Sequence, residues 1–303
     1  MKKAILVLLL GLALSGTYAC PICGCGGSNM YMGLFPDFRR GFMGLRYNYS
    51  QYHTVLYNDP SQHSSNYYNS MEVWGGENIG KRFQVIGFVP FYFNKQIDDD
   101  GTTTPHGLGD ITVIGQYEIL NTSSINHNYK MLHQQLWVGA GIKLATGSYN
   151  LDVTNPDVTV ADVNAELGTG STDFLLTSLY NLKIKDFGIN ASANYKMNTV
   201  NRQQYKYGNK LSTNLIAFYQ LNTKNVGITP NAGLGYEVIA SNSLSAKKVQ
   251  NTGSSVSNAI MGMECTYRKI GLGLNVQVPI VQNFAEGQTQ LRIKGMAHLT
   301  FGF

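Results

Sequence analysis

The strongest constraint on the fold is a two-residue alternation of apolar and polar side chains over residues 288–303. Apolar side chains occupy positions 291, 293, 297, 299, 301 and 303, and mostly polar residues lie between them. Successive side chains of a strand point to opposite faces of its sheet, so this segment predicts a strand with one apolar and one polar face. Bacterial outer-membrane β-barrels need such strands, because one face meets lipid and the other a wet lumen.

The same alternation recurs in further segments and predicts about twelve strands in all. The other segments are 41–57, 67–78, 81–96, 107–121, 129–147, 170–184, 186–199, 208–222, 226–241, 254–269 and 271–283. Most are longer than the roughly 3 to 10 residues of strands in globular sheets, and none is a continuous apolar run. The chain also has 19 Tyr, a residue typical of the girdles at membrane interfaces. We therefore favour an all-β fold, a transmembrane antiparallel up-and-down β-barrel, over a soluble β-sandwich.

The connections between these segments alternate in length. Short ones fall near 78–81, 183–186, 222–225 and 268–270, with a somewhat longer one at 121–128, and long polar ones fall near 57–66, 97–106, 147–168, 199–207 and 241–253. Outer-membrane barrels have short periplasmic turns and long outer loops, and an even number of strands leaves both chain ends in the periplasm. The 147–168 connection is the candidate for a lid or constriction.

The final segment is expected to close the barrel. It should pair with the first strand near residues 42–57 and so leave no free edge in the membrane. Its alternation assigns Leu291, Ile293, Leu299 and Phe301 to lipid, and Arg292, Lys294 and His298 to the lumen. We also expect this strand to be the contact with the machinery that assembles outer-membrane barrels.

The start of the chain has the features of a secretory signal peptide. Lys2 and Lys3 precede an apolar run over residues 4–14, and small residues follow up to Ala19. The run is shorter than the roughly 20 residues of a membrane-spanning helix. We therefore predict a signal peptide at 1–19, a periplasmic cysteine-containing leader at 20–40 and the barrel at 41–303.

Composition agrees with a single barrel domain. The net charge of +5 is spread along the chain without a Lys/Arg block, so nucleic-acid binding is not predicted. A mean hydropathy of -0.13 is compatible with a barrel, because lipid-facing and lumen-facing residues average out. The expected partners are the lipid of the outer membrane of a Gram-negative bacterium and an unidentified small solute.

Thirteen charged residues fall on the inward-facing parity. They are Arg46, Glu72, Arg82, Asp110, Glu118, Lys143, Asp173, Lys196, Glu237, Glu264, Arg268, Arg292 and Lys294. An Arg or Lys on the lipid face would cost about 2 to 4 kcal/mol at the membrane midplane, which explains this placement. These charges either select solutes in an open lumen or pair across a narrow barrel and hold it shut. Asp110, which follows two glycines, could contact a cation at the mouth or cap a turn.

Three of the four cysteines, Cys20, Cys23 and Cys25, follow the predicted cleavage point. Closely spaced thiolates, helped by Met30 and Met32, would suit Cu(I) or Zn(II). Alternatively, Cys20 is lipidated as the new N-terminal residue, although the usual aliphatic residue three positions before it is missing. In the third interpretation the leader is a flexible segment whose cysteines oxidise among themselves or with a partner.

An enzyme is not predicted. Some barrels of this size are lipid hydrolases that use Ser and His, but neither His133 nor His298 has a serine at a spacing that marks a nucleophile. The sequence has no Gly-x-Ser-x-Gly elbow, Rossmann fingerprint or P-loop.

Two segments resemble a known family. Residues 107–118 read GLGDITVIGQYE, and residues 20–45 carry the motifs CGCGG, NMYMGL and RRGFMGL. They resemble the outer-membrane proteins named for the meta-pathway of phenol degradation, especially the cysteine-led versions of Bacteroidetes that are described as transporters. The resemblance implies a barrel and transport, with no established substrate and no catalytic residues.

The sequence therefore predicts a monomeric, porin-like outer-membrane barrel that passes a small solute through a charged lumen. The alternative is a non-transporting barrel whose cysteine leader binds a soft metal or docks a periplasmic partner. No cofactor is expected apart from a metal at that leader.

Overall fold

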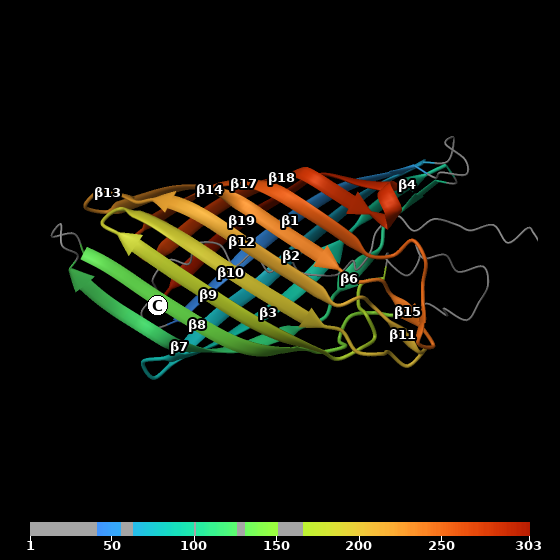
Figure 1. Cartoon of the computed structure of the whole chain (residues 1–303), viewed down its shortest axis with the longest axis horizontal. Coiled ribbons are helices and arrows are strands. Elements are labelled where there is room, and N and C mark those ends of the chain that lie inside the picture. Colours follow the sequence, from blue (N-terminus) through green and yellow to red (C-terminus); the bar gives the residue numbers. More distant parts are fainter. Residues whose placement is uncertain (1–40, 56–62, 100, 126–130, 151–165) are drawn as a thin grey trace, which may run out of the picture.

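The computed structural model describes residues 41–55, 63–99, 101–125, 131–150 and 166–303, and in these residues twelve long antiparallel strands close into a barrel (Figure 1). The strands of the wall are β1 (Gly41–Val55), β2 (His63–Ile79), β3 (Phe83–Phe93), β7 (Thr112–Ile125), β8 (Met131–Lys143), β9 (Asp173–Ile184), β10 (Phe187–Met197), β12 (Lys210–Tyr219), β14 (Val226–Ile239), β17 (Ser254–Tyr267), β18 (Ile270–Phe284) and β19 (Thr289–Gly302). The predicted fold class and number of strands are confirmed.

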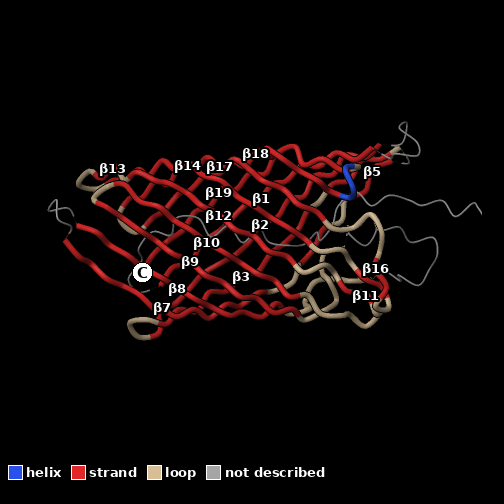
Figure 2. Tube along the Cα trace, viewed as in Figure 1, coloured by secondary structure: helices blue, strands red, loops and turns tan. Residues whose placement is uncertain are grey.

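Strands that are neighbours in sequence are neighbours in the wall, and the barrel closes between β1 and β19. Their register runs from Phe42 opposite Gly302 to Thr54 opposite Thr289. The tilted strands form a continuous wall along most of the molecule (Figure 2). Closure pairs every strand on both sides, as a bilayer requires of a spanning sheet.

The two ends of the barrel differ in their connections. Gly41 lies at the end with the short turns, such as residues 185–186 between β9 and β10, which we call the short-turn end. The long connections lie at the opposite end, the loop end, on the right in Figure 1. Short elements accompany the wall: at the loop end β4 (Lys95–Asp98), β5 (Gly101–Thr103), β6 (His106–Leu108), β11 (Tyr205–Lys206), β15 (Ser243–Leu244), β16 (Lys247–Lys248) and the 3-10 turn η1 (Ala285–Gly287), and at the short-turn end β13 (Leu221–Asn222). The predicted alternation of connections is present among the described residues.

The two faces of the wall follow the predicted alternation. On β18, Leu272 and Leu274 are 48% and 50% exposed, whereas Asn275 on the other face is 3% exposed. Small apolar clusters pack inside the barrel, the largest of them Phe42, Trp74, Ile86, Phe88 and Ile114. The part of the chain that is described contains no helix with the length and apolarity to cross a bilayer.

The alternation fails at one point on β19. Gln51 of β1 lies opposite Ile293 and Tyr52 opposite Leu291, so Arg292 is skipped in the register. Such a bulge adds one residue to the strand, so the side chains on the two sides of the bulge follow opposite parity. Residues before position 292 therefore point to the other face of the wall than the alternation from the C-terminus predicts. Leu291 is 1% exposed inside the barrel and Arg292 is exposed. The assignment of Leu291 to lipid and Arg292 to the lumen was therefore wrong.

Candidate functional site

Eight of the charged side chains inside the barrel form what we call the charged belt. None of them is more than 13% exposed. The members are Arg46, Glu72, Asp110, Lys143, Asp173, Lys210, Glu237 and Lys294. Four are basic and four acidic, so their formal charges cancel. A buried charge is tolerated when it is paired, and every member of the belt is in an ion pair.

Arg46 and Glu72 form the first pair, directly opposite each other on β1 and β2. The guanidinium donates from Nε to Glu72 Oε2 at 2.7 Å and also from Nη2. Its central carbon lies 5.3 Å from the centre of the Trp74 ring and 5.1 Å from that of Phe88. Two hydrogen bonds and two aromatic faces hold this cation in one position.

Lys143 joins two carboxylates at the base of the longest connection. Its Nζ contacts Asp110 and lies 2.9 Å from Asp173 Oδ2. Asp110 also accepts hydrogen bonds from the backbone N–H groups of Gly147, at 2.9 Å, and Thr169, at 3.0 Å. Asp110 therefore caps backbone groups at both ends of the connection and fastens them to the wall. The predicted lid or constriction at residues 147–168 stays a prediction, because its central residues 151–165 lie outside the described residues.

Glu237 holds the third group together. Lys210 on the adjacent strand lies 3.0 Å from it, and Lys294 on β19 lies 3.4 Å from it. Two strands, β17 and β18, separate β14 from β19, so the Lys294 contact reaches over part of the lumen. Lys196 on β10 lies opposite Lys210 in register and is partly buried.

A contact between a histidine and a glutamate lies next to the belt. His298 Nε2 on β19 is 3.0 Å from Glu264 Oε2 on β17, and both side chains are buried. The Trp74 and His298 rings are nearly perpendicular, with ring centres 5.9 Å apart. The pair links the aromatic side of the lumen to the cavity described next.

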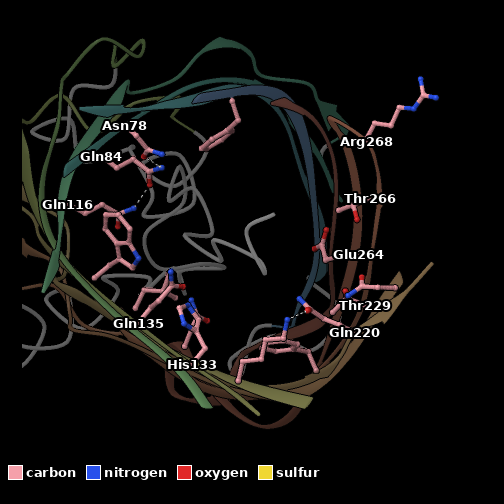
Figure 3. Close-up of a pocket in the computed structure, with 17 residues that line it drawn as sticks. Asn78, Gln84, Gln116, His133, Gln135, Gln220, Thr229, Glu264, Thr266 and Arg268 are labelled. Atoms are coloured by element: carbon pink, nitrogen blue, oxygen red, sulfur yellow. Dashed lines mark hydrogen bonds between the residues drawn. The ribbon is translucent and has the colours of Figure 1, made fainter. Parts of the chain in front are cut away.

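A cavity of about 470 Å³ occupies the short-turn end of the lumen, and we call it the vestibule (Figure 3). Its lining side chains come from strands all round the wall, from Phe42 on β1 to Glu264 on β17. Phe42 lies nearer the short-turn end of its strand than Arg46, and on β9 Asn181 lies nearer that end than Asp173. The charged belt therefore lies between the vestibule and the loop end.

Amide side chains are the largest class of residues in the vestibule lining. Gln116 donates to Gln84 at 2.7 Å, and Gln84 donates to Asn78 at 2.8 Å, which forms a ladder over β7, β3 and β2 (Figure 3). On the opposite wall Lys183 donates to Gln220. Aromatic side chains share the lining: Phe42, Trp137 and Phe218. The surface offers both hydrogen-bond donors and acceptors.

The structure places most of the predicted lumen residues inside. Glu118 is buried and accepts from Asn121 at 2.7 Å. Arg82, Arg268 and Arg292 are exposed instead. Arg82 and Arg268 lie in or beside short turns, where alternation no longer fixes the direction of a side chain, and in Figure 3 Arg268 points away from the vestibule.

Sequence reasoning missed Lys210 and the vestibule amides. Lys210 has inward parity on β12 and could have been found by that signal. The amides have the same parity but carry no charge, and neutral polar residues are common on the inner face of every strand. Cys20, Cys23 and Cys25 lie outside the described residues. Within those described, no group of three or more His, Cys, Asp or Glu is arranged to hold a metal ion.

Comparison with known proteins supports the fold. No family model and no curated protein matches the sequence. An outer-membrane channel from Pseudomonas putida F1 matches the structure with a TM-score of 0.58 and 13% sequence identity, over 89% of this chain and 100% of that one. The β domain of the Bordetella autotransporter BrkA matches with a TM-score of 0.48 and 11% identity, over 87% and 100% of the two chains. The chain thus shares its barrel fold with an outer-membrane channel.

Proposed function

We propose that the protein is an outer-membrane channel of a Gram-negative bacterium that admits a small solute through its lumen. The observation that carries the proposal is the vestibule, a cavity of about 470 Å³ with an amide and aromatic lining that lies inside the barrel wall, next to the charged belt. A barrel filled completely by its own side chains would have no such cavity. The short-turn end is assigned to the periplasm, as in other outer-membrane barrels.

The outer face of the wall supports a membrane location. Large apolar side chains are exposed on strands all round the barrel, among them Leu45, Phe174, Leu215 and Leu234. In a soluble protein an exposed apolar surface of this extent would cause association. In a bilayer it meets lipid, and the charges of the belt remain on the inner face.

The charged belt sets the barrier to passage. Its members are paired and buried, which supports the interpretation that opposite charges hold the lumen shut over the interpretation of an open charged pore. A solute can pass when pairs such as Lys294 with Glu237 separate and their charges become hydrated. Because separation gives up an attraction that is strong in the poorly hydrated interior of the closed state, the open state is expected to be rare.

Single-channel recording in planar bilayers tests this proposal. We expect rare openings of the wild-type protein and a severalfold higher open probability for Glu237→Gln, which weakens the contacts to both Lys210 and Lys294. Glu286→Gln is the matched control, because Glu286 is exposed in η1. If neither the wild type nor Glu237→Gln conducts after verified insertion, the proposal fails.

A further inference from the structure

We propose that the vestibule binds an uncharged, polyhydroxylated solute of the size of a mono- or disaccharide. The inference deepens the proposed function by naming the class of solute, and it rests on that function only for passage beyond the vestibule. It is based on three properties of the vestibule: the amide lining, the aromatic faces and the balance of charge among its described residues.

The lining matches the hydrogen bonding of a sugar. Amides are the largest class of lining side chains, including Asn78, Gln84, Gln116, Gln135, Asn181 and Gln220. Each amide can both donate and accept, as each hydroxyl of a sugar can. The ladder from Gln116 through Gln84 to Asn78 uses one N–H of each Gln. The second N–H of Gln116 and of Gln84 remains for a ligand.

The volume of the vestibule and the apolar part of its lining also suit a sugar. Trp137 on β8 and Phe218 on β12 place aromatic rings beside the amides. Sugars have apolar C–H faces that pack on aromatic rings, whereas their hydroxyls point sideways to hydrogen-bonding groups. A volume of about 470 Å³ lies within the usual range of small-molecule sites, roughly 300 to 1,000 Å³.

The charged groups of the vestibule do not favour a charged ligand. The lining has one acidic and one basic side chain that face the cavity, Glu264 and Lys183, and their formal charges offset each other. Glu264 also contacts His298, and Lys183 donates to Gln220. The Arg268 guanidinium lies 5.3 Å from the centre of the Tyr267 ring and points away from the cavity (Figure 3). Because the remaining lining groups are neutral, the vestibule has no excess of one sign that would attract a carboxylate or an ammonium ion.

Isothermal titration of the purified full-length protein tests the proposal with defined probes. Glucose, glucosamine and glucuronate share one ring and differ in charge, and maltose extends the neutral series. We expect saturable binding of maltose and glucose, and at least tenfold weaker binding of glucosamine and glucuronate. Equal or tighter binding of either charged sugar would overturn the proposal, as would no binding of maltose and glucose to protein whose folding is verified by circular dichroism.

A matched pair of variants on one strand locates the site. Gln135→Leu removes an amide that lines the vestibule, and Gln134→Leu removes the neighbouring amide, which lies on the opposite face and accepts from Tyr180. We expect Gln135→Leu to weaken maltose binding about threefold to tenfold, the effect of one neutral hydrogen bond, and Gln134→Leu to leave it unchanged. Equal effects of the two variants would contradict the assignment.

The outcome is separable from that of the channel proposal. Binding is measured in the absence of any transmembrane flux. A protein that conducts but binds no sugar disproves this inference alone. A protein that binds sugar at the vestibule but never conducts disproves the proposed channel and leaves the binding site in place.

Discussion

His298 on β19 and Glu264 on β17 are 3.0 Å apart, although β18 runs between their strands. The two side chains meet over Gly273 of β18. A Cβ atom at that position would lie 2.0 Å from His298 Nε2 and 2.3 Å from Glu264 Oε2. The pair therefore exists because the intervening strand has no side chain at that position.

Gly273→Ala is expected to separate this pair and destabilise the barrel. The added methyl group overlaps both buried side chains, and overpacking of this kind costs about 1 to 3 kcal/mol. Urea unfolding of the protein in lipid vesicles measures the change. Gly87→Ala is the control, because a Cβ at Gly87 meets nothing within 4 Å. Equal midpoints for the two variants would show that the pair is dispensable for stability.

Arg46→Ala is expected to lower the free energy of unfolding by about 3 to 5 kcal/mol, because it leaves the buried carboxylate of Glu72 without its partner. Arg46→Met combined with Glu72→Leu removes both charges and should restore most of the loss. The double-mutant cycle is measured by urea unfolding. If the effects of Arg46→Met and Glu72→Leu alone add up to that of the double variant, the two side chains do not stabilise each other.

Asp110→Asn is expected to loosen the connection between β8 and β9. The amide cannot accept all the hydrogen bonds that Gly147, Thr169 and Lys143 donate to the carboxylate, and an unsatisfied buried donor costs about 1 to 3 kcal/mol. Proteinase K should then cleave between residues 144 and 172 severalfold faster than in the wild type. The control variant Asp186→Asn, which changes an exposed turn, should be cleaved by proteinase K at the wild-type rate.

In the metal-binding interpretation, the cysteine leader binds Cu(I) or Zn(II) through Cys20, Cys23 and Cys25. Titration of the mature protein against a chromophoric chelator should show one metal ion per chain, and the triple Cys→Ser variant should show none. Mass spectrometry of the mature N-terminus determines whether Cys20 is free or lipidated. Identical titrations of the two proteins would remove the leader as a metal site.

The fold followed from the sequence because a two-residue period is a property of each strand alone. Strand number, order and connection lengths all follow from it, and β1 pairs with β19 as expected. The period cannot show a bulge, because one extra residue on β19 depends on how β1 pairs with it. Leu291 and Arg292 therefore exchanged faces.

The candidate site was less predictable. Parity placed Arg46, Glu72 and Asp173 inside, but no local pattern shows which carboxylate a given cation will contact. The contact of Lys294 with Glu237 spans two intervening strands and depends on the curvature of the closed wall. Neutral amides such as Gln84 and Gln116 are common on polar strand faces, so only the cavity distinguishes them.

The pairing of β1 with β19 also bears on how the protein folds. Phe42 and Gly302 lie opposite each other although nearly the whole described chain separates them in sequence. Contacts between distant residues form slowly, because the entropy of closing a long loop must be overcome first. Until they form, β1 and β19 both present unpaired backbone groups that can recruit other chains. Protection of these two edges during synthesis and insertion is therefore the step at which this barrel is most exposed to aggregation.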